Sequence, residues 1–240
     1  MYEYFNAIEE RHWWFQARKE IVLRLIDQHY EKGKKLEVLD IGCGTGMTLK
    51  ALEKYGEVWG LDKNIKAIEY SKKKAPEAQV MQGSFPAQVP AKQFDIITVL
   101  DVIEHIEEDG RALQKLAQTL KPNGIAVITA PAYKLHWTGH DDMNEHKRRY
   151  TAPELKQKLR DAGLEIKKIS YYNTLLFFPI AAAKIMSRVF SPHAKSHFTA
   201  APPPAFLNLP LKAIFAFEKY LLPHINFPFG ISIIAVATRK

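Results

Sequence analysis

The sequence has 240 residues, 47% of them hydrophobic, which is enough to bury one full core with an elaboration. Its single cysteine excludes a framework of internal disulfides. The net charge of +8 is unevenly placed, because residues 171–240 carry seven basic side chains and one acidic side chain. The first residues, MYEYFNAIEE, lack the basic and apolar regions of a signal peptide, which predicts a cytoplasmic protein.

Residues 1–33 precede the first predicted strand and contain a helical pattern that opens with Trp13, Trp14 and Phe15 and continues to Ile26. Two interpretations fit this segment. The helix could pack its aromatic residues across the sheet edge, or it could form a lid over a bound ligand.

A glycine-rich turn follows the first predicted strand, Leu36–Ile41. A helical pattern covers residues 45–55. Gly42 and Gly44 come just before it, and Gly46 lies in its first turn. Glycines let the backbone approach a ligand closely, and the N-terminus of a helix offers free N–H groups to an anionic group. The dinucleotide fingerprint needs its third glycine at position 47, where this chain has Met. A dinucleotide oxidoreductase is therefore the less favoured interpretation.

Predicted strands and helices alternate along the rest of the chain, which is typical of a doubly wound α/β sheet. The predicted strands are 36–41, 57–61, 78–81, 94–100, 125–130, 164–172 and 230–237, and the predicted helices between them are 45–55, 65–74, 107–120 and 152–162. Ligands bind such sheets beyond the C-terminal ends of the strands. Asp40, Asp62 and Asp101 lie at three such ends, which is the strongest internal support for a site there.

Three segments together resemble the class I S-adenosylmethionine-dependent methyltransferases: VLDIGCGTG, LDVIEHI and EHKRRYTAPELKQKLRDAGLEI. Within this family they resemble the small-molecule and lipid branch that includes ubiquinone-biosynthesis O-methyltransferases. The resemblance covers roughly residues 10–172 and the last strand. It implies a three-layer Rossmann-like fold with a mostly parallel seven-stranded sheet, an antiparallel last strand and a helical insertion before it. It also implies S-adenosylmethionine as cofactor and S-adenosylhomocysteine as product.

The resemblance also implies a set of cofactor-binding residues. Asp62, 20 residues after Gly42, suits the two ribose hydroxyls, although it could also cap the next helix. Arg18 could reach the methionine carboxylate or lie on a solvated helix face. Ser84 stands where relatives often carry an acid, so adenine recognition would fall to backbone groups and Phe85. The full set is Arg18, Asp40, Gly42, Gly44, Thr45, Gly46, Asp62, Ser84, Phe85 and Leu100.

An oxygen or carbon acceptor must lose a proton during methylation, and histidine is a suitable base near neutral pH. His105 is the first candidate because it follows the fourth strand, although it could instead hold the loop by hydrogen bonds. His140 and His146, in the long loop 131–150, are rival bases. No metal is expected. The alternative is a divalent-cation site at Asp101, Glu104 and His105, in which Asp101 replaces a glutamate of the family's pattern.

The predicted organisation has four parts: a helical lid (1–33), the cofactor-binding core (34–172), an apolar basic insertion (173–229) and the final core strand (230–240). In the insertion, Leu175–Ala183 is apolar, Lys184 and Arg188 follow at helical spacing, and 198–204 is a proline-rich joint. A helix is predicted over 205–222, with Asn208, Lys212 and Lys219 on one polar stripe.

The insertion could be a substrate lid, a homodimer contact or a contact with an anionic membrane, which would place the protein peripherally on the inner face of a membrane. An apolar lid implies a small, apolar or lipid-like acceptor. Two other functions stay open: an RNA methyltransferase, supported only by the charge, and a non-catalytic methyltransferase-like subunit that binds a partner through 173–229. Nucleic acid is the less favoured partner because the basic residues lie among apolar ones.

Overall fold

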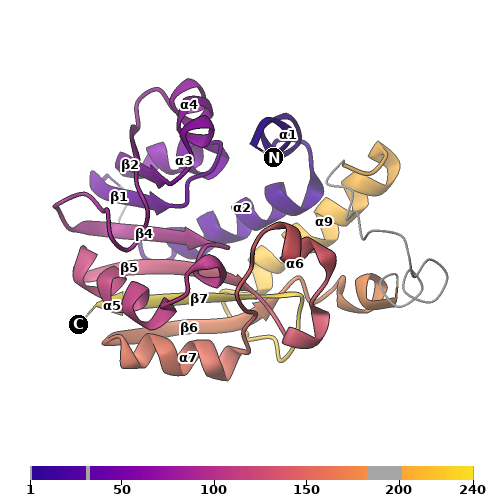
Figure 1. Cartoon of the computed structure of the whole chain (residues 1–240). Helices are drawn as coiled ribbons and strands as arrows, with labels where there is room; N and C mark the ends of the chain where they lie inside the picture. Colours follow the sequence, from indigo (N-terminus) through magenta and orange to yellow (C-terminus); the bar gives the residue numbers. More distant parts are fainter. Residues whose placement is uncertain (1, 31–32, 183–201, 240) are drawn as a thin grey trace.

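The computed structural model describes residues 2–30, 33–182 and 202–239. These residues form a seven-stranded sheet in the order β3-β2-β1-β4-β5-β7-β6 (Figure 1). Its strands are β1 (Leu36–Ile41), β2 (Gly56–Asp62), β3 (Gln79–Gln82), β4 (Phe94–Leu100), β5 (Leu120–Pro131), β6 (Leu164–Tyr172) and β7 (Ser232–Arg239). Strands β1 to β5 pair in parallel, whereas β7 is antiparallel to both β5 and β6. This topology confirms the predicted fold class.

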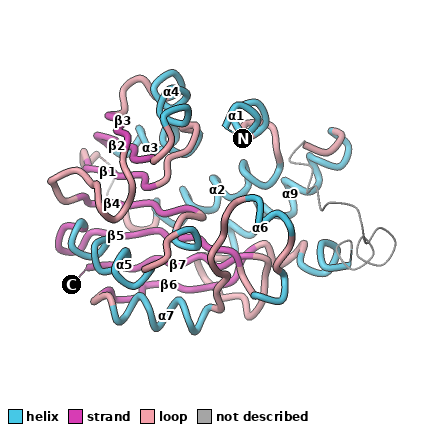
Figure 2. Tube along the Cα trace, viewed as in Figure 1, coloured by secondary structure: helices cyan, strands magenta, loops and turns pink. Residues whose placement is uncertain are grey.

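Helices cover both faces of the sheet (Figure 2). One face packs against α2 (Trp13–Asp27), α3 (Met47–Leu52) and α9 (Ala205–Leu221), and the other against α5 (Asp109–Thr119) and α7 (Ala152–Asp161). Successive strand residues point to opposite faces, so Val38 belongs to the core on the α2 side and Leu39 to the core on the α5 side. Both faces are therefore apolar, as a mostly parallel sheet requires.

Local sequence signals explain several element boundaries. Thr151 and Glu154 form the capping box that starts α7. Strands β1, β4 and β6 and helix α4 (Ile65–Lys74) have the predicted bounds. The helix predicted from residue 45 begins instead at Met47, because Gly46 has a positive φ of 93°. Its last turn is the 3-10 helix η1 (Glu53–Tyr55).

The segment 131–150 was predicted as a loop, but it contains the short elements η3 (Lys134–His136) and α6 (Gly139–Met143). The prediction was wrong in this detail because α6 is stabilised by side-chain hydrogen bonds around Asp141, and apolar periodicity does not reveal such bonds. The last predicted strand, 230–237, is shifted by two residues at each end, to Ser232–Arg239.

Helix α9 of the insertion lies along α2 (Figure 1). Its polar stripe faces α2 rather than solvent. Asn208 accepts a hydrogen bond from the backbone N–H of Trp13 at 3.0 Å, and Lys212 and Lys219 pair with Glu20 at 3.2 and 2.6 Å. The opposite face is apolar and exposed, and its large side chains are Phe206, Leu207, Leu209, Ile214, Phe217 and Tyr220.

Glu218, near the end of α9, anchors the insertion to the sheet. Its side chain is fully buried and accepts hydrogen bonds from three consecutive backbone N–H groups, those of Asn173 (2.7 Å), Thr174 (2.6 Å) and Leu175 (2.9 Å). These are the first residues after β6. One carboxylate therefore fixes the start of the insertion against its last helix.

Residues 177–182 are helical, and the predicted positions Lys184, Arg188 and Phe198 lie outside the described residues. Among the helices that the structure describes, none has the length and apolar character needed to cross a membrane.

Candidate active site

The glycine turn after β1 has a backbone that only glycine fits well. A Cβ on Gly42 would lie 2.3 Å from a methyl carbon of Val102, and one on Gly46 would lie 2.9 Å from the Cα of Ser71. Both residues have a positive φ. Gly44 also has a positive φ, of 55°, but a Cβ there would meet no atom within 4 Å. Gly44 therefore faces open space.

This open space belongs to a cavity of about 1810 Å³ beyond the C-terminal ends of β1, β2 and β4. Residues from α1 (Tyr2–Ile8), α2 and the segment 131–150 complete its walls. Of the predicted site residues, those that line it are Arg18, Asp40, Gly42, Gly44, Thr45, Asp62, Ser84, Phe85, Leu100, Asp101, Glu104, His105 and His146. Gly46 packs against Ser71 instead, and the side chain of His140 lies outside what the structure describes.

Asp62 ends β2 and turns its carboxylate toward the glycine turn. One oxygen accepts a hydrogen bond from the backbone N–H of Gly44 at 3.0 Å, and the other from that of Asn64 at 2.9 Å. Burial raises the pKa of Asp62, although these hydrogen bonds oppose the shift. Helix α4 is capped by the side chain of Asn64, which accepts from the N–H of Lys66. The alternative prediction that Asp62 caps this helix is therefore wrong.

Two further buried polar groups lie at the glycine turn, one in β1 before it and one within it. Asp40 is buried and accepts a hydrogen bond from the hydroxyl of Thr98 at 2.6 Å, and burial raises its pKa to about 7. The hydroxyl of Thr45 is buried without a hydrogen-bond partner among the described residues. A polar atom in this state usually has a partner such as water or a ligand.

Arg18 reaches from α2 across the cavity to Asp101, with which it forms an ion pair. Its guanidinium also lies over the ring of Trp14, 4.6 Å from the ring centre. The side chain of Arg18 is only 12% exposed, so the prediction of a solvated helix-face arginine is wrong. Asp101 has a positive φ of 55°, and its backbone N–H donates to the hydroxyl of Thr129.

Two histidines and one glutamate meet on the far side of the cavity. The ring centres of His105 and His146 lie 4.7 Å apart, and the potential ligand atoms of Glu104 and these histidines all lie within 4.8 Å of one another. Burial lowers the pKa of His105 to about 4. Burial, reinforced by the charge of Asp101, raises the pKa of Glu104 well above its usual range. Asp101 itself pairs with Arg18 and is not part of this group.

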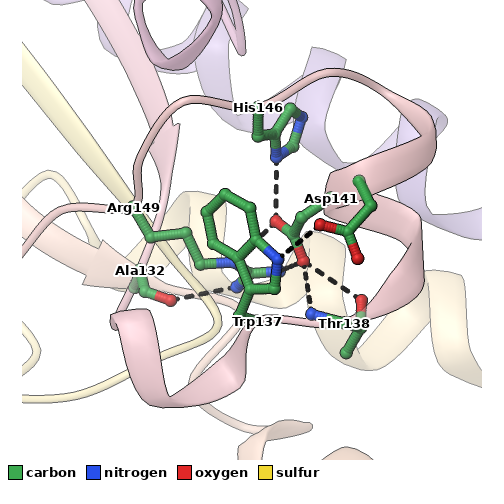
Figure 3. Close-up of polar contacts among 7 residues, drawn as sticks. Ala132, Trp137, Thr138, Asp141, His146 and Arg149 are labelled. Atoms are coloured by element: carbon green, nitrogen blue, oxygen red, sulfur yellow. Dashed lines mark hydrogen bonds and ion pairs between the residues drawn. The ribbon is translucent and has the colours of Figure 1, made fainter.

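A buried carboxylate that sequence reasoning did not single out supports His146 (Figure 3). Asp141 has no exposed surface and accepts a hydrogen bond from the ring of His146 at 2.8 Å. Arg149 donates to both of its oxygens, at 2.7 and 2.9 Å. The only sequence signal was the crowding of acidic, basic and histidine residues in 136–150, which does not say which of them meet.

The fold and the cavity at the glycine turn together define a class I methyltransferase. The model of a methyltransferase domain family matches residues 11–169, and the chain belongs to this family. It is an S-adenosylmethionine-dependent methyltransferase, and S-adenosylmethionine is its cofactor.

Curated relatives indicate which branch of the methyltransferase family the chain resembles. The chain is 31% identical over 172 residues to the ubiquinone biosynthesis O-methyltransferase of Rickettsia canadensis, covering 63% of this chain and 72% of the relative. It is also 31% identical over 170 residues to the protein of the same name from Rickettsia felis, covering 63% and 70%. It therefore resembles the branch that was predicted from its three motifs.

Solved structures agree on the fold. A TehB-like S-adenosylmethionine-dependent methyltransferase from Corynebacterium glutamicum superimposes with a TM-score of 0.56 at 21% identity, covering 92% of this chain and 88% of that chain. A putative methyltransferase of Haloferax volcanii, solved with the activator Trm112, has a TM-score of 0.64 at 17% identity, covering 100% and 98%. The N-methyltransferase NodS of Bradyrhizobium japonicum, solved with S-adenosylhomocysteine, has a TM-score of 0.53 at 18% identity, covering 65% and 77%.

Proposed function

We propose that this methyltransferase transfers a methyl group to an oxygen or carbon atom of a small, largely apolar acceptor. One observation carries the proposal: a single cavity extends from the glycine turn to His105 and His146. It can therefore hold the cofactor and a neighbouring acceptor together. Apolar side chains such as Phe15, Trp137 and Ile180 also line it, which favours an apolar acceptor. Among the described residues of its wall, carboxylates outnumber cationic side chains, which disfavours a nucleic-acid acceptor.

The residues of the turn fit the cofactor. Among the described residues, the backbone at Gly44 faces open space and the hydroxyl of Thr45 has no hydrogen-bond partner, so a bound ligand could supply both contacts. In this proposal Asp62 accepts hydrogen bonds from the two ribose hydroxyls of the cofactor, and Arg18 binds its methionine carboxylate. Ser84 and Phe85 border the adenine. When bound, the cofactor supplies an electrophilic methyl group on a sulfonium. The chain's own tasks are to align the acceptor, to exclude water and to remove its proton.

The N-terminal residues support the proposal of a lid. Tyr2 and Phe5 of α1 line the cavity together with Trp14 of α2. Burial, together with the charge of Asp62, raises the pKa of Tyr2 to about 12. We propose that α1 and the start of α2 cover the cofactor and keep water from the reacting atoms.

Of the predicted bases, the geometry favours His146. A base with a pKa of about 4, as burial gives His105, holds a proton poorly near neutral pH. His146 lines the same cavity, and its ring is hydrogen-bonded to the carboxylate of Asp141, which can hold the ring in one orientation. We propose no metal requirement. Mn²⁺-dependent activity that is lost on chelation would instead support a cation site, and Glu104, His105 and His146 would then be its ligands.

We predict that Asp62→Ala weakens binding of S-adenosylhomocysteine by about 10- to 100-fold, because a hydrogen bond to a charged group contributes about 1.5–3 kcal/mol. Calorimetric titration measures the affinity, and thermal unfolding checks that the variant is folded. Asp161→Ala is the control, since Asp161 is an exposed acid of α7 that does not line the cavity. Equal affinities of the wild type and the Asp62 variant would refute the proposed ribose contact.

We further propose that the exposed apolar face of α9 contacts a membrane surface. Its polar stripe is turned inward to α2, so the outward face carries only apolar side chains and the hydroxyl of Tyr220. An exposed helix face of this kind is typical of interfacial helices. Because Lys212 and Lys219 pair with Glu20, attraction to anionic lipid would come mainly from the other basic residues of 171–240.

Flotation with vesicles of phosphatidylglycerol and phosphatidylcholine at low salt tests this contact. We expect the wild type to float and a Phe206→Glu/Phe217→Glu variant to remain below. Leu135→Glu is a matched control, because Leu135 is 83% exposed but lies on η3, outside the α9 face. Failure of the wild type to float would contradict the proposal. If sedimentation then showed a dimer that the double variant lost, the face would be a homodimer contact.

A further inference from the structure

Asp141 is surrounded by donors on all sides. In addition to His146 and Arg149, the backbone N–H and the hydroxyl of Thr138 donate to it, at 2.7 and 3.1 Å. Burial alone would raise the pKa of Asp141, but its hydrogen bonds with His146 and Arg149 lower it well below its usual range. Asp141 is therefore an ionised carboxylate. It can accept hydrogen bonds but cannot donate one.

This fixes the proton on His146. Nδ1 of His146 lies 2.8 Å from an oxygen of Asp141, and two groups that can only accept would not form a bond at this distance. Nδ1 must therefore carry a hydrogen. In the neutral ring the lone pair is then on Nε2, which points away from Asp141 (Figure 3). This is the form in which an imidazole can accept a proton at Nε2.

Other contacts hold Asp141 itself in place. Arg149 donates its remaining terminal nitrogen to the backbone carbonyl of Ala132 at 3.0 Å, directly after β5. The backbone N–H of His146 donates to the backbone carbonyl of Asp141 at 2.9 Å. The pair is therefore tied to the end of a core strand, although α6 and the surrounding loop have little apolar packing of their own.

We infer that Asp141 is a positioning residue, which holds His146 in the Nδ1–H form with Nε2 toward the acceptor. The inference rests on the proposed function, in which His146 is the base. As the acceptor oxygen bonds to the methyl carbon, its O–H bond breaks and the proton passes to Nε2. The electron pair of the broken S–C bond stays on sulfur, and the positive charge moves from the sulfonium to the imidazolium. Asp141 stabilises that charge, and the proton then leaves to solvent.

The tautomer can be measured without cofactor or acceptor. Long-range ¹H–¹⁵N correlation spectra of histidine-labelled protein report which ring nitrogen carries the hydrogen. A His146→Gln variant identifies the signals of His146. We expect the Nδ1–H form in the wild type, and its replacement by the Nε2–H form in Asp141→Asn, because the amide can donate to Nδ1. Asp142→Asn is the matched control, since Asp142 bonds to Trp137 rather than to His146, and it should leave the tautomer unchanged.

Either an Nε2–H form in the wild type or an Nδ1–H form that persists in Asp141→Asn would overturn the inference. A kinetic experiment then separates positioning from mere support of the loop. With an alkylated catechol as the probe acceptor, we expect Asp141→Asn to lower kcat by about 100-fold at an unchanged KM and an unchanged affinity for S-adenosylhomocysteine. An unchanged kcat would overturn the positioning role. If the wild type does not methylate the catechol, this probe is not an acceptor, and the tautomer result alone decides whether Asp141 orients His146.

Discussion

Gly44→Ala is expected to reduce the affinity for S-adenosylhomocysteine by at least about 100-fold while the protein stays folded. A Cβ at this position meets no atom of the described residues within 4 Å, so it would project into the space proposed for the cofactor. The positive φ of 55° adds a strain of about 1 kcal/mol, which a domain of this size can tolerate. Calorimetric titration gives the affinity, and thermal unfolding gives the stability.

The matched control is Gly163→Ala. Gly163 directly follows the C-cap of α7 and has a φ of 82°; a Cβ there also meets no atom of the described residues within 4 Å, but the residue does not line the cavity. The two variants should therefore lose similar stability, and only the Gly44 variant should lose affinity. Normal binding by a folded Gly44→Ala protein would show that the cofactor does not approach this part of the turn.

Glu218→Ala is expected to destabilise the protein by about 3–5 kcal/mol. The substitution leaves three backbone N–H groups without an acceptor, two of them buried and that of Leu175 part-buried, and each buried group costs about 1–3 kcal/mol. Because these groups belong to consecutive residues, their costs should not add fully. The loss corresponds to a Tm lower by roughly 10 °C for a chain of this length. Thermal and urea unfolding would measure it.

Glu20→Ala provides the comparison. Glu20 also ties α9 to the rest of the molecule, through Lys212 and Lys219, but its side chain is 29% exposed. Exposed ion pairs contribute about 0–1 kcal/mol, so this variant should unfold close to the wild type. If the two variants proved equally stable, the three hydrogen bonds of Glu218 would not be what anchors the insertion.

The sheet and the turn were predictable because their signals are local. The strand of Phe94–Leu100 is a largely apolar run, and the glycines 42, 44 and 46 mark a turn that few other residues could form. Asp62 could be placed near the turn because parallel strands end at one edge of the sheet. Each of these inferences needs only the order of residues along one or two elements.

The contacts between distant segments were not predictable in the same way. The ion pair of Arg18 with Asp101 joins two elements, and the periodicity of residues along each element does not reveal the angle at which they pack. The polar stripe of α9 was visible, but its direction depended on Glu20, an unremarkable helix residue in the sequence. Asp141 was one of several acids in 136–150, and its importance comes from the partners that surround it.

The position of β7 has a consequence for the order in which the molecule can be completed. Since β7 lies between β5 and β6, the strand β6 has no neighbour in the sheet until residues 232–239 have been made. During synthesis, strands β1 to β5 can pair as they leave the ribosome. Strand β6 and the apolar residues of the insertion stay unpaired until β7 has been made. This interval is when an unpaired strand is most open to aggregation, and when a chaperone would have most effect on the yield of folded enzyme.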